Sequence, residues 1–326
     1  MTTTVSQPVP PEATDPARNS ADSLSDTTAS PVSAWESVSF SLVQGAAVVV
    51  LSLVGLRGLY RFGQAFGLLE WSINYRRRRR FTRALKRVLG RHLSSAERRH
   101  WTRDHFVKTR CDKLFYLVLH RIPRERAAAL LTIKNEPALQ AAFARNRGVY
   151  AATFHHGALH VVAMLLSLKG YKVVGVRDPH ESGLRRFMQR KLDLKYPELD
   201  RARIVFSSAF PREIYRSFKD GWMVGSSMDV SRVRAPNQRT EDVTIFGETR
   251  SFISGPLRIA LRCAATIFQT VIHLDTGFRY SIEFIGPLVD PDTDHDEDST
   301  VTAMMRTYAA NVEHHVRATP SLMTKL

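Results

Sequence analysis

From residue 148 onward, short apolar segments typical of strands alternate with segments typical of helices. The predicted strands are 149–154, 171–176, 202–207, 222–228, 265–273 and 280–288, and the predicted helices are 157–170, 183–192, 211–221 and 255–264. Strands that alternate with helices in this way form a mostly parallel sheet covered on both faces. The sequence therefore predicts an α/β fold with a mostly parallel central sheet flanked by helices. In such sheets the chemistry lies at the carboxyl ends of strands.

The chain before this region divides by composition. Residues 1–36 are rich in Ser, Thr, Pro and Asp, which predicts a disordered tail. Residues 37–56 carry no charged side chain, so 37–60 is predicted to be a membrane anchor helix long enough to span a bilayer. A helix lying in the membrane interface and a buried helix are the open alternatives. Residues 61–147 are predicted to form a helical lead-in, and 148–326 the α/β core.

The charge of the chain indicates an anionic partner. The formal net charge is +16, and membrane lipid, nucleic acid and an acidic protein or substrate would all fit it. Five consecutive arginines, Arg76 to Arg80, follow the apolar run, and no nucleic-acid-binding motif follows them. This arrangement favours anionic membrane lipids and predicts no nucleic-acid partner. The positive-inside rule places the arginine-rich side and everything after it in the cytoplasm.

Three histidines lie in "TFHHGALHVV", residues 153–162. His155 directly follows a predicted strand, where a neutral imidazole can accept a proton near pH 7. A helix starting near Gly157 would present backbone N–H groups to a developing negative charge, and a residue without a side chain lets a substrate approach closely. A buried structural turn is the alternative. His156 and His160 could share a helix face and bind zinc, but no third ligand has a recognisable spacing, so we predict no metal.

Basic side chains follow the next predicted strand. Arg177 ends that strand, and Arg185, Arg186 and Arg190 come soon after it. Guanidinium groups bind phosphate and carboxylate through two parallel hydrogen bonds. A solvated helix face is the alternative, and it suits Arg186 and Arg190 better than Arg177.

Four motifs in a fixed order resemble a known family. They are the strand-terminal "HHG" at 155–157, "VVGVRDP" with Arg177, "SFKDGWMVGSSMD" with Gly221 and Asp229, and "VTIFGETRSFISGPLRIALRCAA" at 243–265. From about residue 50 to 320 the chain resembles a divergent member of the lipid A biosynthesis (lauroyl/myristoyl) acyltransferase branch of the lysophospholipid acyltransferase superfamily.

The resemblance implies a membrane-bound acyltransferase on the cytoplasmic side of the bacterial inner membrane. Such an enzyme would move a fatty acyl chain from an acyl carrier protein or acyl-CoA thioester to a hydroxyl or amine of a lipid A-like or other glycolipid or phospholipid acceptor, without a cofactor. The implied partners are the acyl carrier protein, anionic membrane lipids and the lipid acceptor. The residues expected to contact the substrates are Gly157, Arg177, Arg185 and Asp229.

The family motif His-x4-Asp/Glu makes His155 the general base, but His160 holds the position of the carboxylate. Three interpretations follow. His160 is itself catalytic and orients His155. Alternatively, Asp178, Glu181 or Asp229 supplies the carboxylate from a neighbouring strand end. In the third interpretation the site is impaired, and the protein is a membrane adaptor with the same fold.

Overall fold

The central sheet has the predicted class. The computed structural model describes residues 34–90, 93–177, 183–196, 202–206, 210–229, 239–293 and 296–324. Within these residues seven strands form one sheet, in the order β1-β9-β8-β2-β5-β3-β4. They are β1 Leu131–Lys134, β2 Val149–Thr153, β3 Val173–Arg177, β4 Ala202–Phe206, β5 Met223–Ser227, β8 Thr266–Leu274 and β9 Tyr280–Ile285. Neighbouring strands are parallel except β8 and β9, so the predicted α/β fold with a mostly parallel sheet is confirmed.

Helices cover both faces of the sheet. Successive residues of each strand point to opposite faces, so each strand contributes to two apolar cores. In β2, Val149 and Ala151 belong to one apolar core and Tyr150 and Ala152 to the other. The helices that contribute to the first core are α1 Ala34–Ile73, α3 Ser95–Val118, α4 Arg124–Ala128, α5 Glu136–Ala144, α6 Leu159–Leu168 and α7 Gly183–Lys195. Those that contribute to the second are α2 Tyr75–Leu89, α8 Phe210–Lys219, α9 Gly255–Arg262 and α10 Glu297–Ala318.

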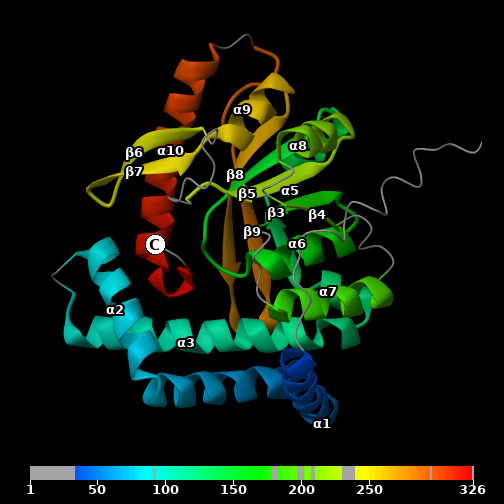
Figure 1. Cartoon of the computed structure of the whole chain (residues 1–326), viewed down its shortest axis with the longest axis vertical. Coiled ribbons are helices and arrows are strands. Elements are labelled where there is room, and N and C mark those ends of the chain that lie inside the picture. Colours follow the sequence, from blue (N-terminus) through cyan, green and yellow to red (C-terminus); the bar gives the residue numbers. More distant parts are fainter. Residues whose placement is uncertain are drawn as a thin grey trace, which may run out of the picture.

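Two features depart from the sequence-based expectations. The strand β1 falls in the segment 61–147 that was expected to be helical, and it pairs in parallel with β9. A separate antiparallel hairpin, β6 Thr240–Ile245 and β7 Glu248–Ile253, was not predicted. The hairpin lies against α10 (Figure 1). The strand β1 pairs with β9, and the hairpin packs against α10. Because these partners are distant in the chain, the local sequence pattern did not indicate either element.

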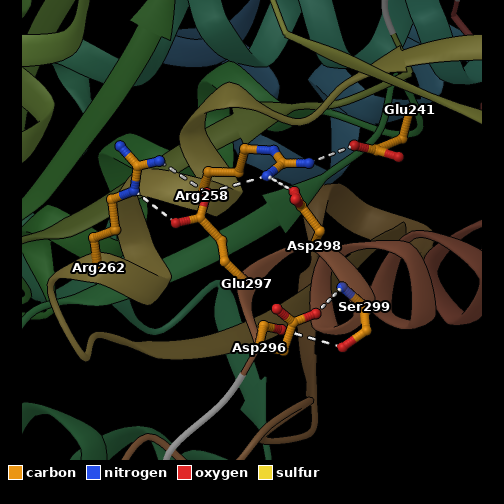
Figure 2. Close-up of polar contacts among 7 residues, drawn as sticks. All are labelled: Glu241, Arg258, Arg262, Asp296, Glu297, Asp298 and Ser299. Atoms are coloured by element: carbon orange, nitrogen blue, oxygen red, sulfur yellow. Dashed lines mark hydrogen bonds and ion pairs between the residues drawn. The ribbon is translucent and has the colours of Figure 1, made fainter.

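Arg258 links the hairpin to α9 and α10 (Figure 2). Its guanidinium group donates to Glu241 of β6 at 2.7 Å (Nη2 to Oε1) and to Glu297 of α10 at 3.1 Å (Nη1 to Oε1), and it pairs with Asp298. Arg262 adds a second contact to Glu297, at 2.7 Å from Nε to Oε2. The side chain of Arg258 is buried, so its charge depends on these carboxylates for compensation.

The N-terminal helices form a layer at one edge of the molecule (Figure 1). Among the described helices, α1 is the one that is long and apolar enough to cross a membrane, judged by length and composition. It runs past residue 60 to Ile73 and changes direction at Gly55, which has a positive φ of 65°. Its second half runs alongside α3 (Figure 1). An apolar N-terminal helix was predicted, and α1 is that helix.

Candidate active site

The turn that carries His155 connects β2 to α6. Gly157 has a positive φ of 71°, and a Cβ atom there would lie 2.9 Å from the carbonyl oxygen of Ile272 in β8. Other residues rarely adopt this backbone conformation, and the approach is too close for a side chain. Gly157 therefore allows the turn to pack against β8. The helix begins at Leu159, two residues later than predicted.

The C-terminal end of the chain is hydrogen-bonded to this turn. The amide of Gly157 donates to the carbonyl of Leu322 at 2.8 Å, and the amide of Thr324 donates to the carbonyl of His155 at 2.9 Å. His156 and Met323 form an isolated antiparallel bridge. The N–H of Gly157 is therefore already bonded and is not itself open to an anion.

His155 contacts a carboxylate. Its Nδ1 lies 2.7 Å from Oδ1 of Asp229, and its backbone amide donates to Oδ2 of the same residue at 2.8 Å. A carboxylate only accepts hydrogen bonds, so Nδ1 carries a hydrogen, and in the neutral form of the ring Nε2 is then the nitrogen with the lone pair. The side chain of Asp229 is 3% exposed and that of His155 is 17% exposed. The carboxylate is thus buried behind an imidazole that solvent or substrate can reach.

Strand pairing explains why these two residues meet. In the sheet β5 lies beside β2, with Thr153 opposite Ser227, so their carboxyl ends share one edge. The amide of Met228 donates to the carbonyl of Thr153 at 3.1 Å, and the amide of Ile253 in β7 donates to the carbonyl of Met228 at 3.2 Å. The residue before Asp229 is therefore held from both sides, by the end of β2 and by the end of the hairpin.

His160 lies against a different acid. Its Nε2 is 3.6 Å from Oδ2 of Asp112 in α3, and its ring meets the ring of Tyr116 edge-on, with centroids 4.8 Å apart. The hydroxyl of Tyr280 donates to Oδ1 of Asp112 at 3.3 Å. Burial raises the pKa of Asp112 to about 7, although Tyr280 and the positive charge of Arg185 oppose this shift. His160 and Arg185 therefore both belong to the surroundings of Asp112.

His156 faces the interior. Its ring nitrogens lie 3.2 Å from the carbonyl oxygens of Ile272 and Thr319, and its side chain is buried. Burial lowers its pKa to about 4, so the ring is neutral near pH 7. These contacts give His156 a structural role in fixing the turn. Over the part of the chain that the structure describes, no three His, Cys, Asp or Glu side chains gather in a way that could hold a metal ion.

The whole described domain matches one family. A family model described as "Bacterial lipid A biosynthesis acyltransferase" matches residues 35–321, which is most of the chain. The chain belongs to the bacterial lipid A biosynthesis acyltransferase family. The family implies an acyltransferase, in agreement with the resemblance seen in the sequence. A comparison with curated proteins gives no match.

In this lipid A acyltransferase family member, the predicted site residues fall into two groups. His155, Gly157 and Asp229 lie together at the carboxyl edge of the sheet, whereas His160 and Arg185 surround Asp112. Arg177 ends β3 as predicted. The side chains of Arg177, Arg186 and Arg190 lie outside the described part, as do residues Asp178 and Glu181.

Sequence reasoning did not select Asp112, Tyr280 or the segment 319–324. A signal for Asp112 existed, since Asp112 and Lys113 are the two charged residues in the stretch 111–119, whose other residues are apolar. An acid on an apolar helix face is buried at a cost unless it has a partner. The segment 319–324 carried no comparable signal, because its contacts to the turn are largely made by backbone atoms.

Proposed function

We propose that this protein transfers a fatty acyl chain from an acyl carrier protein or acyl-CoA thioester to a hydroxyl or amine of a lipid acceptor, with His155 as general base. The observation that carries the proposal is the 2.7 Å contact between Nδ1 of His155 and Oδ1 of Asp229. A histidine whose Nδ1–H is held by a carboxylate has the correct tautomer and orientation to accept a proton at Nε2.

The reaction would use these two residues in sequence. Nε2 of His155 accepts the proton of the acceptor hydroxyl or amine as its oxygen or nitrogen attacks the thioester carbonyl carbon. The carbon–sulfur bond then breaks, and the leaving thiolate takes up the proton. The carboxylate of Asp229 stabilises the imidazolium that forms between these steps. The thioester is a co-substrate, and no cofactor enters this scheme.

In this proposal Asp229 takes the role of the acid in the family motif His-x4-Asp/Glu, a position that His160 holds in this chain. Nδ1 of His155 is paired with Asp229, and Nε2 must stay open to the acceptor, so His160 is not needed to orient the base. His160, Asp112 and Arg185 are instead proposed to shape the neighbouring part of the site, where Arg185 contributes positive charge. Arg177 and Gly157 are proposed to lie near the bound substrates.

The proposed place of action is the cytoplasmic face of the bacterial inner membrane. The apolar helix α1 and the excess of 47 Lys and Arg over 31 Asp and Glu support attachment to anionic lipids. The same excess of positive charge suits an acidic acyl carrier protein as donor. A lipid A-like molecule or another glycolipid or phospholipid is the proposed acceptor, and nucleic acid is not a proposed partner.

The alternative is a catalytically impaired membrane adaptor, suggested by His160 at the motif's acidic position. The Asp229 contact favours the enzyme, because a carboxylate still orients the base. The test is incubation of the full-length protein in detergent with labelled acyl-acyl carrier protein or acyl-CoA and a bacterial membrane lipid extract. Mass spectrometry should detect an acylated lipid with the wild type and far less with His155→Ala. An unmodified extract with both donors would favour the adaptor.

A further inference from the structure

The helix α1 carries two different faces along its whole length. One face packs on the protein and includes the buried residues Gln44, Ala47, Leu56 and Leu59. The other is exposed and largely apolar, with members on both sides of the bend at Gly55. The exposed large apolar side chains are Trp35, Val38, Leu42, Val43, Val49, Leu53, Val54, Phe62, Phe66, Leu69 and Ile73.

The first half of α1 lies side by side with α7. The rings of Phe40 and Phe187 are 5.7 Å apart between centroids, and Nε2 of Gln44 lies 3.2 Å from Sδ of Met188. A Cβ atom on Gly183 would come within 3.5 Å of Oε2 of Glu36. The contacts advance together along both helices, so α1 and α7 run in the same direction over this stretch.

Polar contacts fix this arrangement. The side-chain amide of Gln44 donates to the carbonyl of Leu117 at 2.9 Å, and its oxygen accepts from Lys191 of α7. A buried amide needs such partners, and here the globular part of the protein supplies them.

This packing is incompatible with a helix that crosses the bilayer. If residues 35–54 spanned the hydrocarbon, the N-terminal part of α1, which contacts α7, would lie in the half of the bilayer farther from the catalytic domain. The helix α7 would then be drawn in with it, including Lys191 and Lys195. Charged side chains in hydrocarbon are costly, and α7 has more of them than a membrane-embedded helix tolerates.

We infer that α1 lies in the membrane surface without crossing it, with its exposed apolar face in one leaflet of an anionic bilayer. Arg57 and Arg61 are exposed, as are Leu53, Val54 and Phe62, so the exposed side of α1 combines basic and apolar side chains as an interfacial helix does. The acid Glu70 near the end of α1 is paired with Arg77 and Arg110 and adds no free negative charge. It follows that both ends of α1 are on the same side of the membrane as the catalytic domain.

This inference goes beyond the proposed function and does not depend on acyl transfer, so each can fail without the other. The topology is tested by labelling with a membrane-impermeant maleimide in a Cys263→Ser background. One reporter is Thr3→Cys, ahead of α1. The other is Leu194→Cys, on the surface of α7, where Leu194 is 88% exposed. Both are labelled in intact spheroplasts and in inverted inner-membrane vesicles, with detergent lysis to show that each thiol can react.

The two reporters should behave alike, reacting in one preparation and remaining protected in the other. Opposite behaviour, with Thr3→Cys reacting only where Leu194→Cys is protected, would show that α1 crosses and would overturn the inference.

The lipid contact is tested by sedimentation with phosphatidylglycerol vesicles. The double variant Leu42→Glu and Leu53→Glu alters the exposed face and should lose at least tenfold in vesicle binding, whereas the matched control Leu194→Glu should bind like the wild type. Both changes are at exposed positions, and circular dichroism checks the fold. Wild-type vesicle binding by the double variant would contradict the inference.

Discussion

The two nitrogens of the His155 imidazole have different surroundings, and this difference decides the proposed chemistry. Nδ1 is held at 2.7 Å by Asp229, whose other oxygen accepts from the backbone amide of His155. One buried carboxylate thus accepts two hydrogen bonds, which hold both the ring and the turn. Nε2 is left for the acceptor. His160, at the position of the family's acid, instead lies 3.6 Å from Asp112.

A change at His160 should therefore be milder than one at His155. We expect His160→Ala to retain acyl transfer within about tenfold of the wild type, because a general base, worth about 10²–10⁴-fold, is not removed. His160→Glu should fare worse than His160→Ala, since it puts a second carboxylate beside Asp112, whose pKa is already raised by burial. Initial rates on the same acceptor compare the two. Equal loss in His160→Ala and His155→Ala would assign His160 a direct role.

At the scale of elements, the active-site turn depends on parts of the chain far from it in sequence. The C-terminal segment holds the turn through the Leu322 carbonyl and the Thr324 amide. The hairpin holds the residue before Asp229 through the amide of Ile253, and Arg258 ties that hairpin to α9 and α10. Each of these elements should affect the site without touching the substrate.

Removal of the C-terminal segment tests the first of these dependences. A chain ending at Pro320 loses the backbone partners of His155 and Gly157. We expect its acyl transfer to fall at least tenfold while α-helical circular dichroism changes little. The control is a chain that ends at Thr324 and keeps those partners. Full activity of the shorter chain would show that the turn holds its conformation alone.

Replacement of Arg258 tests how much its contacts to the hairpin and α10 stabilise the fold. Arg258→Ala removes a buried guanidinium and leaves the carboxylate of Glu241 without its 2.7 Å partner, so we expect the free energy of unfolding to fall by about 2 kcal/mol. Arg262→Ala is the matched control, because that side chain is 60% exposed and exposed ion pairs contribute at most about 1 kcal/mol. Urea unfolding in detergent measures both. Equal losses would mean that burial of Arg258 does not matter.

The elements that the sequence predicted correctly are those whose own residues determine them. The buried strands read as apolar runs because both of their faces are covered, and α8 and α9 carry Pro in their first turns. The strand β1 is only four residues, "LTIK", and becomes a strand by pairing with β9, far along the chain. That partner cannot be found from local pattern.

The candidate site was partly predictable for the same reason. His155 follows a strand directly, so its place at the sheet edge needed only local sequence. The acid that contacts His155 could be identified only once the order of the strands in the sheet was known. The sequence left Asp178, Glu181 and Asp229 as equal candidates, and the order of the strands, in which β5 lies between β2 and β3, brings Asp229 to the base. Asp112 comes from α3, and its place depends on how helices pack on the sheet.

At the scale of the whole molecule, several histidines are buried without charge. Burial lowers the pKa of both His105 and His156 to about 4. His105 stacks on Phe81 at 3.8 Å between centroids and contacts the carbonyl of Ser321 at 2.9 Å, so it joins α2, α3 and the C-terminal segment. These rings stabilise the fold only while they are neutral.

Stability should therefore fall in mild acid. In the unfolded chain these histidines take up protons below their ordinary pKa of about 6.5, whereas in the folded chain they do so only near pH 4. The unfolded chain therefore binds more protons between these two values, and the free energy of unfolding decreases as the pH falls through that range. The loss is at most about 3 kcal/mol for each ring, and protonation of Asp112, whose pKa burial raises to about 7 in the folded chain, offsets part of the sum. Urea unfolding at pH 7 and pH 5 measures it, with His105→Gln expected to show a smaller decrease. A midpoint independent of pH would contradict this account.

The central claim, that His155 and Asp229 act together as the base of an acyl transfer, is tested most directly by a double-mutant cycle of transfer rates. The four chains are the wild type, His155→Ala, Asp229→Asn and the double variant, all checked for folding by circular dichroism. Each single change should lower the rate by about 10²–10⁴-fold. Residues that work as one unit lose their effect together, so the double variant should be no slower than His155→Ala. Wild-type turnover by either single variant, or a double loss equal to the product of the two single losses, would contradict the claim.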